Sequence, residues 1–292
     1  MNMKKIFALL MAGLLVCSLA ACGKDGGKEE DTNKKNAADE EMVYEEFTYA
    51  INGEGTYEIT GVIYNGVTPI DIEIPAKIVD RKVTGIAADA FKASKTIKSV
   101  TFESVKDEET EEMVTYIQYI GEFAFYDCDA ITEIVLPDSI TEIGAGAFRG
   151  CDKLVSVKLP AGLKAIDDYT FMDCKALTGV VLPEGLESIG AAAFWGCDAI
   201  TEIAVPASLK DMGDAAFYFC KNLKKATVLG EALGKAETIG EGEDAEIVEH
   251  TIGEIVFKSC AADLVITVTE GTEFAKYANE NKYSVVINVV AE

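Results

Sequence analysis

Residues 138–206 read DSITEIGAGAFRGCDKLVSVKLP (138–160), AGLKAIDDYTFMDCKALTGVVLP (161–183) and EGLESIGAAAFWGCDAITEIAVP (184–206). The three segments share one 23-residue pattern, and the same step continues beyond them. Phenylalanine, cysteine and proline all keep this step, at Phe125, Phe148, Phe171, Phe194 and Phe217, at Cys128, Cys151, Cys174, Cys197 and Cys220, and at Pro137, Pro160, Pro183 and Pro206. A fixed period of this length predicts a solenoid, in which each repeat forms one coil and packs only on its neighbours.

Each repeat predicts one strand and one turn. Leu154, Val157 and Leu159 have the L-x-x-L-x-L spacing of a leucine-rich repeat strand. Ser156 and Lys158 are therefore expected to face solvent, because side chains of a strand alternate between its two sides. The Ala-Phe-x-x-Cys stretch favours a short helical turn whose phenylalanine points into the coil. The proline ends each strand, at a place where a missing N–H costs little.

The pattern resembles the BspA-type leucine-rich repeat of bacterial surface proteins, over roughly residues 71–292. The resemblance implies a leucine-rich repeat solenoid, mostly β with short helical turns, and about seven coils of 23-residue period with terminal caps. It also implies adhesion, since relatives of this repeat type include adhesins for host matrix proteins and for other bacteria. Repeat architecture by itself does not establish that function.

The start of the chain predicts a lipid-anchored protein outside the cytoplasm. MNMKK is followed by a short apolar core and by Leu19-Ala20-Ala21-Cys22, which resembles a bacterial lipobox. The resemblance implies cleavage before Cys22, lipidation of its thiol and surface exposure on a bacterial cell membrane. The alternative is an ordinary secretion signal with a chance cysteine.

The chain divides into five predicted segments. Residues 1–21 are the lipoprotein signal peptide, and residues 22–42 are a disordered charged tether, because they have almost no apolar content. Residues 43–70 form an N-terminal cap with a hairpin around Asn52-Gly53, and residues 71–270 form the solenoid. Residues 271–292 form a C-terminal cap, with a helix that begins after Thr272 and a last strand.

Two insertions interrupt the repeat. Phe91 and Phe125 are 34 residues apart, and Phe217 and Phe257 are 40 apart, so the steps exceed the repeat by 11 and 17 residues. Both insertions are acidic and are expected to form loops on one face of the solenoid. Carboxylates of the second insertion are of the type that binds calcium, but they lack the order of a dedicated calcium loop and favour a hydrated acidic loop (Glu241, Glu243, Asp244, Glu246). The sequence predicts no metal site and no cofactor.

Cysteine placement favours a structural role. Six cysteines, counting Cys260, occupy the same position in successive repeats, which predicts a column of inward, reduced thiols. The coil spacing of ~4.8 Å is compatible with a disulfide, but parallel side-chain directions disfavour the required torsion.

Composition and motifs argue against nucleic-acid binding and catalysis. The net charge of −24 excludes the basic surface that nucleic acid requires, and favours a basic protein partner or one reached through calcium. His250 is the single histidine, has no nucleophile motif around it and is interpreted as a solvated loop residue. We therefore expect no enzymatic activity.

Two surfaces are candidate binding faces. The first is the row that directly follows each core phenylalanine, and it is rich in the residue types found at protein interfaces: Tyr126, Arg149, Met172, Trp195 and Tyr218. A cover over the turns is the alternative interpretation of this row. The second is the exposed strand face: Glu133, Val135, Ser156, Lys158, Gly179, Val181, Glu202, Ala204, Lys225 and Thr227. The predicted ligand is a protein, of the host matrix or of another bacterial surface; the alternative is a glycan or an assembly partner of the cell envelope.

Overall fold

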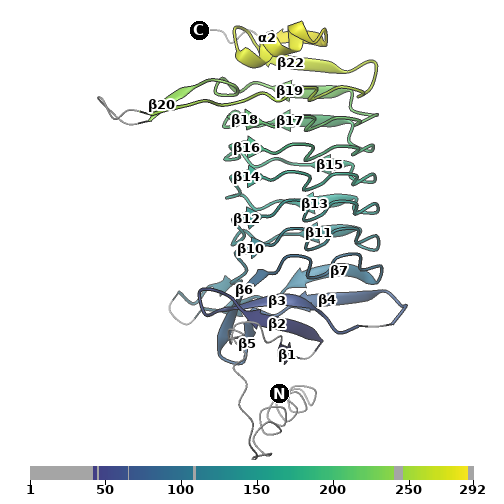
Figure 1. Ribbon diagram of the computed structural model, residues 1–292, viewed down its shortest axis with the longest axis vertical. Helices are drawn as coiled ribbons and strands as arrows, with labels where there is room; N and C mark the ends of the chain where they lie inside the picture. Colours follow the sequence, from purple (N-terminus) through teal and green to yellow (C-terminus); the bar gives the residue numbers. More distant parts are fainter. Residues whose placement is uncertain (1–41, 45, 65, 108–109, 240–245, 289–292) are drawn as a thin grey trace, which may run out of the picture.

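The computed structural model describes residues 42–44, 46–64, 66–107, 110–239 and 246–288. Figure 1 shows an elongated stack of coils, with a small sheet at the N-terminal end and helix α2 (Glu273–Glu280) at the other. Consecutive strands along the stack pair in parallel, one repeat apart, as in the pairing of Val157 with Ile134 and with Val180. The predicted solenoid of mostly β structure is confirmed.

One strand of each coil belongs to a first ladder, which forms the strand face and is divided into three parallel sheets. Its members are β4 (Ile70–Ile74), β7 (Ile97–Phe102), β11 (Glu133–Val135), β13 (Ser156–Lys158), β15 (Gly179–Val180), β17 (Glu202–Val205), β19 (Lys225–Val228), β22 (Val265–Thr269) and β23 (Ser284–Asn288). Burial alternates along these strands as predicted, since Val157 is buried between the exposed Ser156 and Lys158.

A second ladder was not predicted. It contains β3 (Tyr57–Val62), β6 (Arg81–Ile86), β10 (Tyr119–Ile120), β12 (Glu142–Ile143), β14 (Ala165–Ile166), β16 (Ser188–Ile189) and β18 (Asp211–Met212). Most of these strands are two residues long, so a period-2 pattern is too short to recognise in sequence. Each regular coil is therefore a short strand, a turn around the core phenylalanine, and a second strand.

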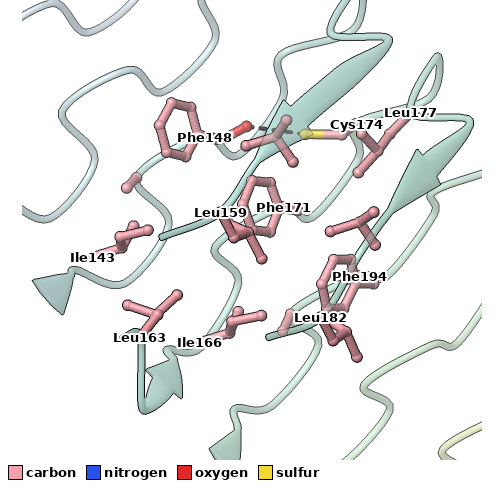
Figure 2. Packing of buried hydrophobic residues seen from close by; sticks show 14 of the residues in the cluster. Ile143, Phe148, Leu159, Leu163, Ile166, Phe171, Cys174, Leu177, Leu182 and Phe194 are labelled. Atoms are coloured by element: carbon pink, nitrogen blue, oxygen red, sulfur yellow. Dashed lines mark hydrogen bonds between the residues drawn. The ribbon is translucent and has the colours of Figure 1, made fainter. Parts of the chain in front are cut away.

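The core is a stack of phenylalanine rings along the solenoid axis. The rings of Phe148 and Phe171 lie nearly parallel at 5.5 Å, and those of Phe171 and Phe194 at 5.4 Å. Figure 2 shows these rings surrounded by the aliphatic side chains of the two ladders. Because Phe171 is fully buried between two identical neighbours, each coil completes the core of the next.

The turn around each phenylalanine is a bonded layer between coils. Within one coil, alternate N–H groups donate to the carbonyl three residues earlier, as Ala147 N–H does to Gly144. Residues two before and two after the phenylalanine have positive φ, which interrupts the helix and turns their N–H groups toward the next coil. Phe148 N–H likewise donates to Thr170 in the next coil at 2.9 Å. Each turn therefore contains isolated hydrogen bonds of the helical kind, and these do not join into a continuous helix.

Close approach of consecutive turns favours glycine at one position in most coils. A Cβ on Gly213 would lie 2.4 Å from the Ala191 nitrogen, and one on Gly190 equally close to the nitrogen of Asp168. Asp167 occupies the equivalent place in its own repeat and is exposed there.

The N-terminal cap is a small antiparallel sheet, and the predicted hairpin is confirmed. β1 (Met42–Tyr44) pairs with β2 (Phe47–Ile51), and β2 pairs with β3 around Asn52. The Asn52 side chain accepts from Thr56 N–H and donates to Thr84 Oγ1, both at 3.1 Å, which ties the hairpin to the first coil. A short strand β5 (Lys77–Ile78) pairs with β6 beside it.

The C-terminal cap is also as predicted. Helix α2 (Glu273–Glu280) begins after Thr272, whose hydroxyl accepts from Ala275 N–H at 3.1 Å, and β23 follows it. Phe274 packs edge-on against Phe257, with centroids 6.1 Å apart. The Tyr277 hydroxyl accepts from Val256 N–H at 3.0 Å, whereas the equivalent N–H of an interior coil, such as that of Ala147, donates to a carbonyl of its own coil.

Both insertions form hairpins rather than plain loops. The first contains β8 (Val105–Lys106) and β9 (Met113–Val114), and the second contains β20 (Glu237–Ile239) and β21 (Glu246–Val248). Figure 1 shows β20 projecting sideways from the stack. Glu241, Glu243 and Asp244 lie outside the described residues, as do residues 1–41 with Cys22, the signal peptide and nearly all of the tether.

Candidate binding ridge

The row that follows the core phenylalanines lies along one edge of the solenoid. Each turn holds its phenylalanine inward, so the next side chain points outward, and all five members are half-buried: Tyr126, Arg149, Met172, Trp195 and Tyr218. The aligned, partly exposed row expected from sequence is therefore present.

Three further aromatic residues extend this row, and the sequence analysis missed them. Phe123 and Tyr169 stand two residues before a core phenylalanine and Phe219 stands two after one. These are the positive-φ positions of the turn, with φ of 53°, 60° and 61°. Tyr169 is 40% exposed and Phe219 is 38% exposed. The signal in the sequence is a bulky side chain two positions before or two positions after a core phenylalanine, where most repeats have a small or polar residue. We call the row and these three residues the ridge.

Cations join the rings at the N-terminal half of the ridge. Lys92 lies over Phe123 at 5.4 Å and over Tyr126 at 5.7 Å. The Arg149 guanidinium lies over Tyr126 at 5.8 Å and over Tyr169 at 5.9 Å. These contacts are in the range of cation–π attraction, so they hold the guanidinium against the rings of the preceding and following coils.

The C-terminal half of the ridge is an aromatic cluster. Trp195 and Tyr218 meet edge-on with centroids 4.6 Å apart, and Tyr218 meets Phe219 at 4.7 Å. The ring of Phe219 is almost parallel to that of Trp195, at 7° and 6.4 Å. Met172 belongs to the repeat between that of Arg149 and that of Trp195, so it separates the two halves of the ridge.

The strand face has a different character. Val135 is 61% exposed and Val181 is 85% exposed, but their neighbours in the ladder are short or charged. Lys225 forms an ion pair with Glu202 on the adjacent strand, at 3.8 Å between nitrogen and oxygen. This surface is mixed and has no ring or cation cluster among the described residues.

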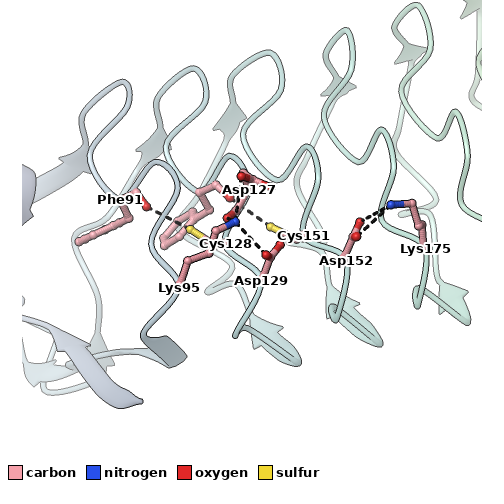
Figure 3. A network of polar contacts seen from close by, with 9 residues as sticks. Phe91, Lys95, Asp127, Cys128, Asp129, Cys151, Asp152 and Lys175 are labelled. Carbon is pink, nitrogen blue, oxygen red and sulfur yellow. Dashed lines mark hydrogen bonds and ion pairs between the residues drawn. The ribbon is translucent and has the colours of Figure 1, made fainter. Parts of the chain in front are cut away.

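A series of lysine–aspartate ion pairs, here called the charge ladder, joins successive coils beside the cysteines. Lys95 bonds Asp127 and Asp129 at 2.9 and 2.8 Å, and Lys175 bonds Asp152 at 2.9 Å, as Figure 3 shows. These side chains are about half exposed, so each pair adds little to stability and chiefly fixes the side chains in place. The pKa of Lys175 is raised, chiefly by the hydrogen bond that its ammonium group donates to Asp152.

The single histidine differs from its predicted environment. The His250 side chain is 8% exposed, and its Nδ1 lies 2.8 Å from a carboxylate oxygen of Asp211. The interpretation as a solvated loop residue is therefore wrong. The chain returns from the second insertion alongside β18, where Thr251 N–H bonds the same Asp211 and Met212 bridges Ile252. The sequence could not predict this pairing, because 39 residues separate His250 from Asp211.

The described residues hold two hollows of about 420 Å³. One lies at the C-terminal end beside Cys260 and Tyr283, and the other lies over the glycine column beside Asp167 and Asp211. Within the same residues, no group of three or more His, Cys, Asp or Glu side chains is placed to hold a metal ion. No described helix is long and apolar enough to span a membrane.

Residues 84–224 match, in six copies, the family model described as BspA type leucine rich repeat region. Among solved structures, a leucine rich cell surface protein from Faecalibacterium prausnitzii is similar to this chain, with a TM-score of 0.51 and 21% sequence identity. The match covers 79% of this chain and 70% of that one. The T. pallidum leucine rich repeat protein is 19% identical, with a TM-score of 0.48, over 86% and 100% of the chains. A leucine-rich repeat protein from Bacteroides ovatus is 21% identical, with a TM-score of 0.41, over 85% and 76%. No curated protein matches the chain significantly.

Proposed function

Because the repeat region of this chain belongs to the BspA type of leucine-rich repeat, we propose that the protein is a non-catalytic binding protein of the bacterial surface. A lipid on Cys22 anchors it to the membrane, residues 22–42 act as the tether, and the solenoid presents the ridge to a protein ligand. Adhesion to a host matrix protein or to another bacterial surface protein is the role that follows.

The observation that carries this proposal is the unbroken series of rings and cations along the ridge. Aromatic residues and arginine are enriched among the residues that dominate binding energy at protein interfaces. Trp195 and Tyr218 are half-buried and in contact at 4.6 Å, so they form a ready-made central pair. Repeat proteins commonly use such extended surfaces to bind partners.

The proposal is tested by capture on an array of matrix proteins and glycans, using the full chain and two double variants. Trp195→Ser with Tyr218→Ser removes the aromatic pair but leaves the inward Phe194 and Phe217, which are fully buried, in place. We expect this variant to stay folded and to lose its partner by at least ~2 kcal/mol, the size of a hot-spot effect.

The matched control is Lys158→Glu with Lys225→Glu, which alters the strand face and leaves the ridge intact. Loss of binding by this control, with binding kept by the Trp195/Tyr218 variant, would move the site to the strand face. Capture of glycans alone by the wild-type chain would instead favour the envelope accessory that captures a glycan.

A further inference from the structure

We infer that the ridge binds an extended segment of its protein partner, one that carries an acidic side chain three residues away from an aromatic or large apolar side chain. This inference rests on the proposed function and specifies the chemistry of the partner. It combines three features of the ridge: an arginine held ready for a carboxylate, a partly exposed aromatic cluster, and the distance between them.

Arg149 is the first feature. The chain has 50 acidic and 26 basic side chains, yet Arg149 forms no ion pair with any acidic side chain among the described residues. Nearby lysines of the charge ladder, Lys175 and Lys221, each bond an aspartate at 2.9 and 2.8 Å. The rings of Tyr126 and Tyr169 cover the guanidinium, so its N–H edges are the groups left for a ligand. A planar guanidinium recognises a carboxylate through two parallel hydrogen bonds.

The aromatic cluster is the second feature. Phe219 has a φ of 61° and remains 38% exposed. A left-handed conformation costs a non-glycine residue roughly 1–2 kcal/mol. The other coils have a small or polar residue at this position, such as Gly150, Asp173 and Gly196, so Phe219 is the one bulky apolar side chain of the column. The fold requires the positive φ but not the aromatic ring, so this exposed apolar surface indicates a contact made with something else.

The spacing is the third feature. Arg149, Met172 and Trp195 are successive members of one column, so two coil steps separate the cation from the indole. Coils stacked at ~4.8 Å put these two groups roughly 10 Å apart along the axis. A segment in the polyproline II conformation rises ~3.1 Å per residue and has about three residues per turn, so side chains three residues apart lie on the same side and span that distance. Met172, between them, offers an adaptable apolar surface to the intervening residues.

Trp195 provides the measurement, because it is the single tryptophan of the chain and its emission reports on the ridge. The full chain in detergent is titrated with the tryptophan-free peptides GSESSFSG, GSQSSFSG and GSEFSSSG. The first has the inferred spacing, the second lacks the charge, and the third places the acid next to the ring. We expect the first peptide to bind at least tenfold more tightly than either of the others.

A double-mutant cycle isolates the carboxylate contact. Arg149→Met should bind the Glu and Gln peptides equally. The matched control is Arg81→Met, since Arg81 is the other arginine and also lies over a ring, that of Tyr57 at 5.6 Å. This control should keep the tenfold difference.

Two results would overturn the inference: equal binding of the three peptides by the wild-type chain, or no change in Trp195 emission with any of them. Neither result bears on the proposed function, which fails separately when the Trp195/Tyr218 variant still captures the partner found on the array.

Discussion

The thiol of Cys174 donates a hydrogen bond to the carbonyl oxygen of Phe148 in the preceding coil, at 3.1 Å. The same bond recurs at every step of the column, up to Cys260 and Phe217. In the first coil Ser94 takes the cysteine position, and its hydroxyl accepts a hydrogen bond from Ile97 N–H at 3.3 Å. The cysteines therefore join coils through hydrogen bonds, which gives the 23-residue spacing a physical cause.

The first prediction concerns the state of these thiols. Burial raises the pKa of Cys128 from its ordinary 9.0 to about 12, so the column is protonated and slow to react in the folded protein. Alkylation in denaturant without reductant should modify all six cysteines from Cys128 to Cys260, as read by mass spectrometry. Three bridges between neighbouring positions would show that the column is a disulfide framework. Native-state alkylation should reach Cys260 first, because it is the half-buried member.

The second prediction compares lesions in the middle and at the end of the stack. Phe171→Ala removes a ring between two parallel neighbours and should cost roughly 3–5 kcal/mol in urea unfolding. Phe257→Ala should cost less, because it releases only the last coil and its cap. Hydrogen exchange should accelerate on both sides of residue 171, but only near the C-terminal end in Phe257→Ala. Equal losses and equally spread exchange would contradict nearest-neighbour coupling.

The third prediction concerns Asp167, which occupies a place where most coils have glycine. Although much of the side chain is exposed, partial burial between the turns raises the pKa of its carboxyl, and the charges of Glu142, Asp168 and Glu122 raise it further. The folded state thus holds this proton more tightly than the unfolded state, so stability falls as pH rises through the folded pKa. Asp167→Asn should therefore raise the melting temperature at pH 7 and leave it unchanged at pH 3. Glu133→Gln, an exposed acid on the strand face, is the control and should show no such difference.

The fourth prediction concerns the anchor. Cys22→Ser removes the thiol that lipidation requires, so the variant should appear in the culture medium or stay unprocessed. Partition between membrane and medium measures this, with Cys17→Ser as the matched control, since Cys17 lies within the signal peptide. If Cys22→Ser protein sediments with membranes as the wild type does, the lipoprotein hypothesis is wrong.

The 23-residue repeat predicts part of the ridge and leaves the rest unpredicted. The row of Tyr126, Arg149 and Trp195 followed from phase alone, because a residue beside an inward phenylalanine must point outward. Phe219 did not follow, because its outward direction depends on a positive φ that no pattern of apolar residues signals. The cation–ring contacts of Arg149 were equally hidden, since they join residues one repeat apart through rotamers.

The sequence by itself determined the solenoid, the phenylalanine stack, both caps and the column of cysteines. It did so because a coil can bury its apolar edge only against an identical neighbour, which forces equivalent residues into register. Tertiary structure decided the second ladder, the pairing of His250 with Asp211 and the extent of the ridge. These features depend on where two-residue strands, a long insertion and left-handed residues place groups that are distant in the chain. Such contacts depend on how the coils stack, and the local sequence around each residue does not determine that geometry.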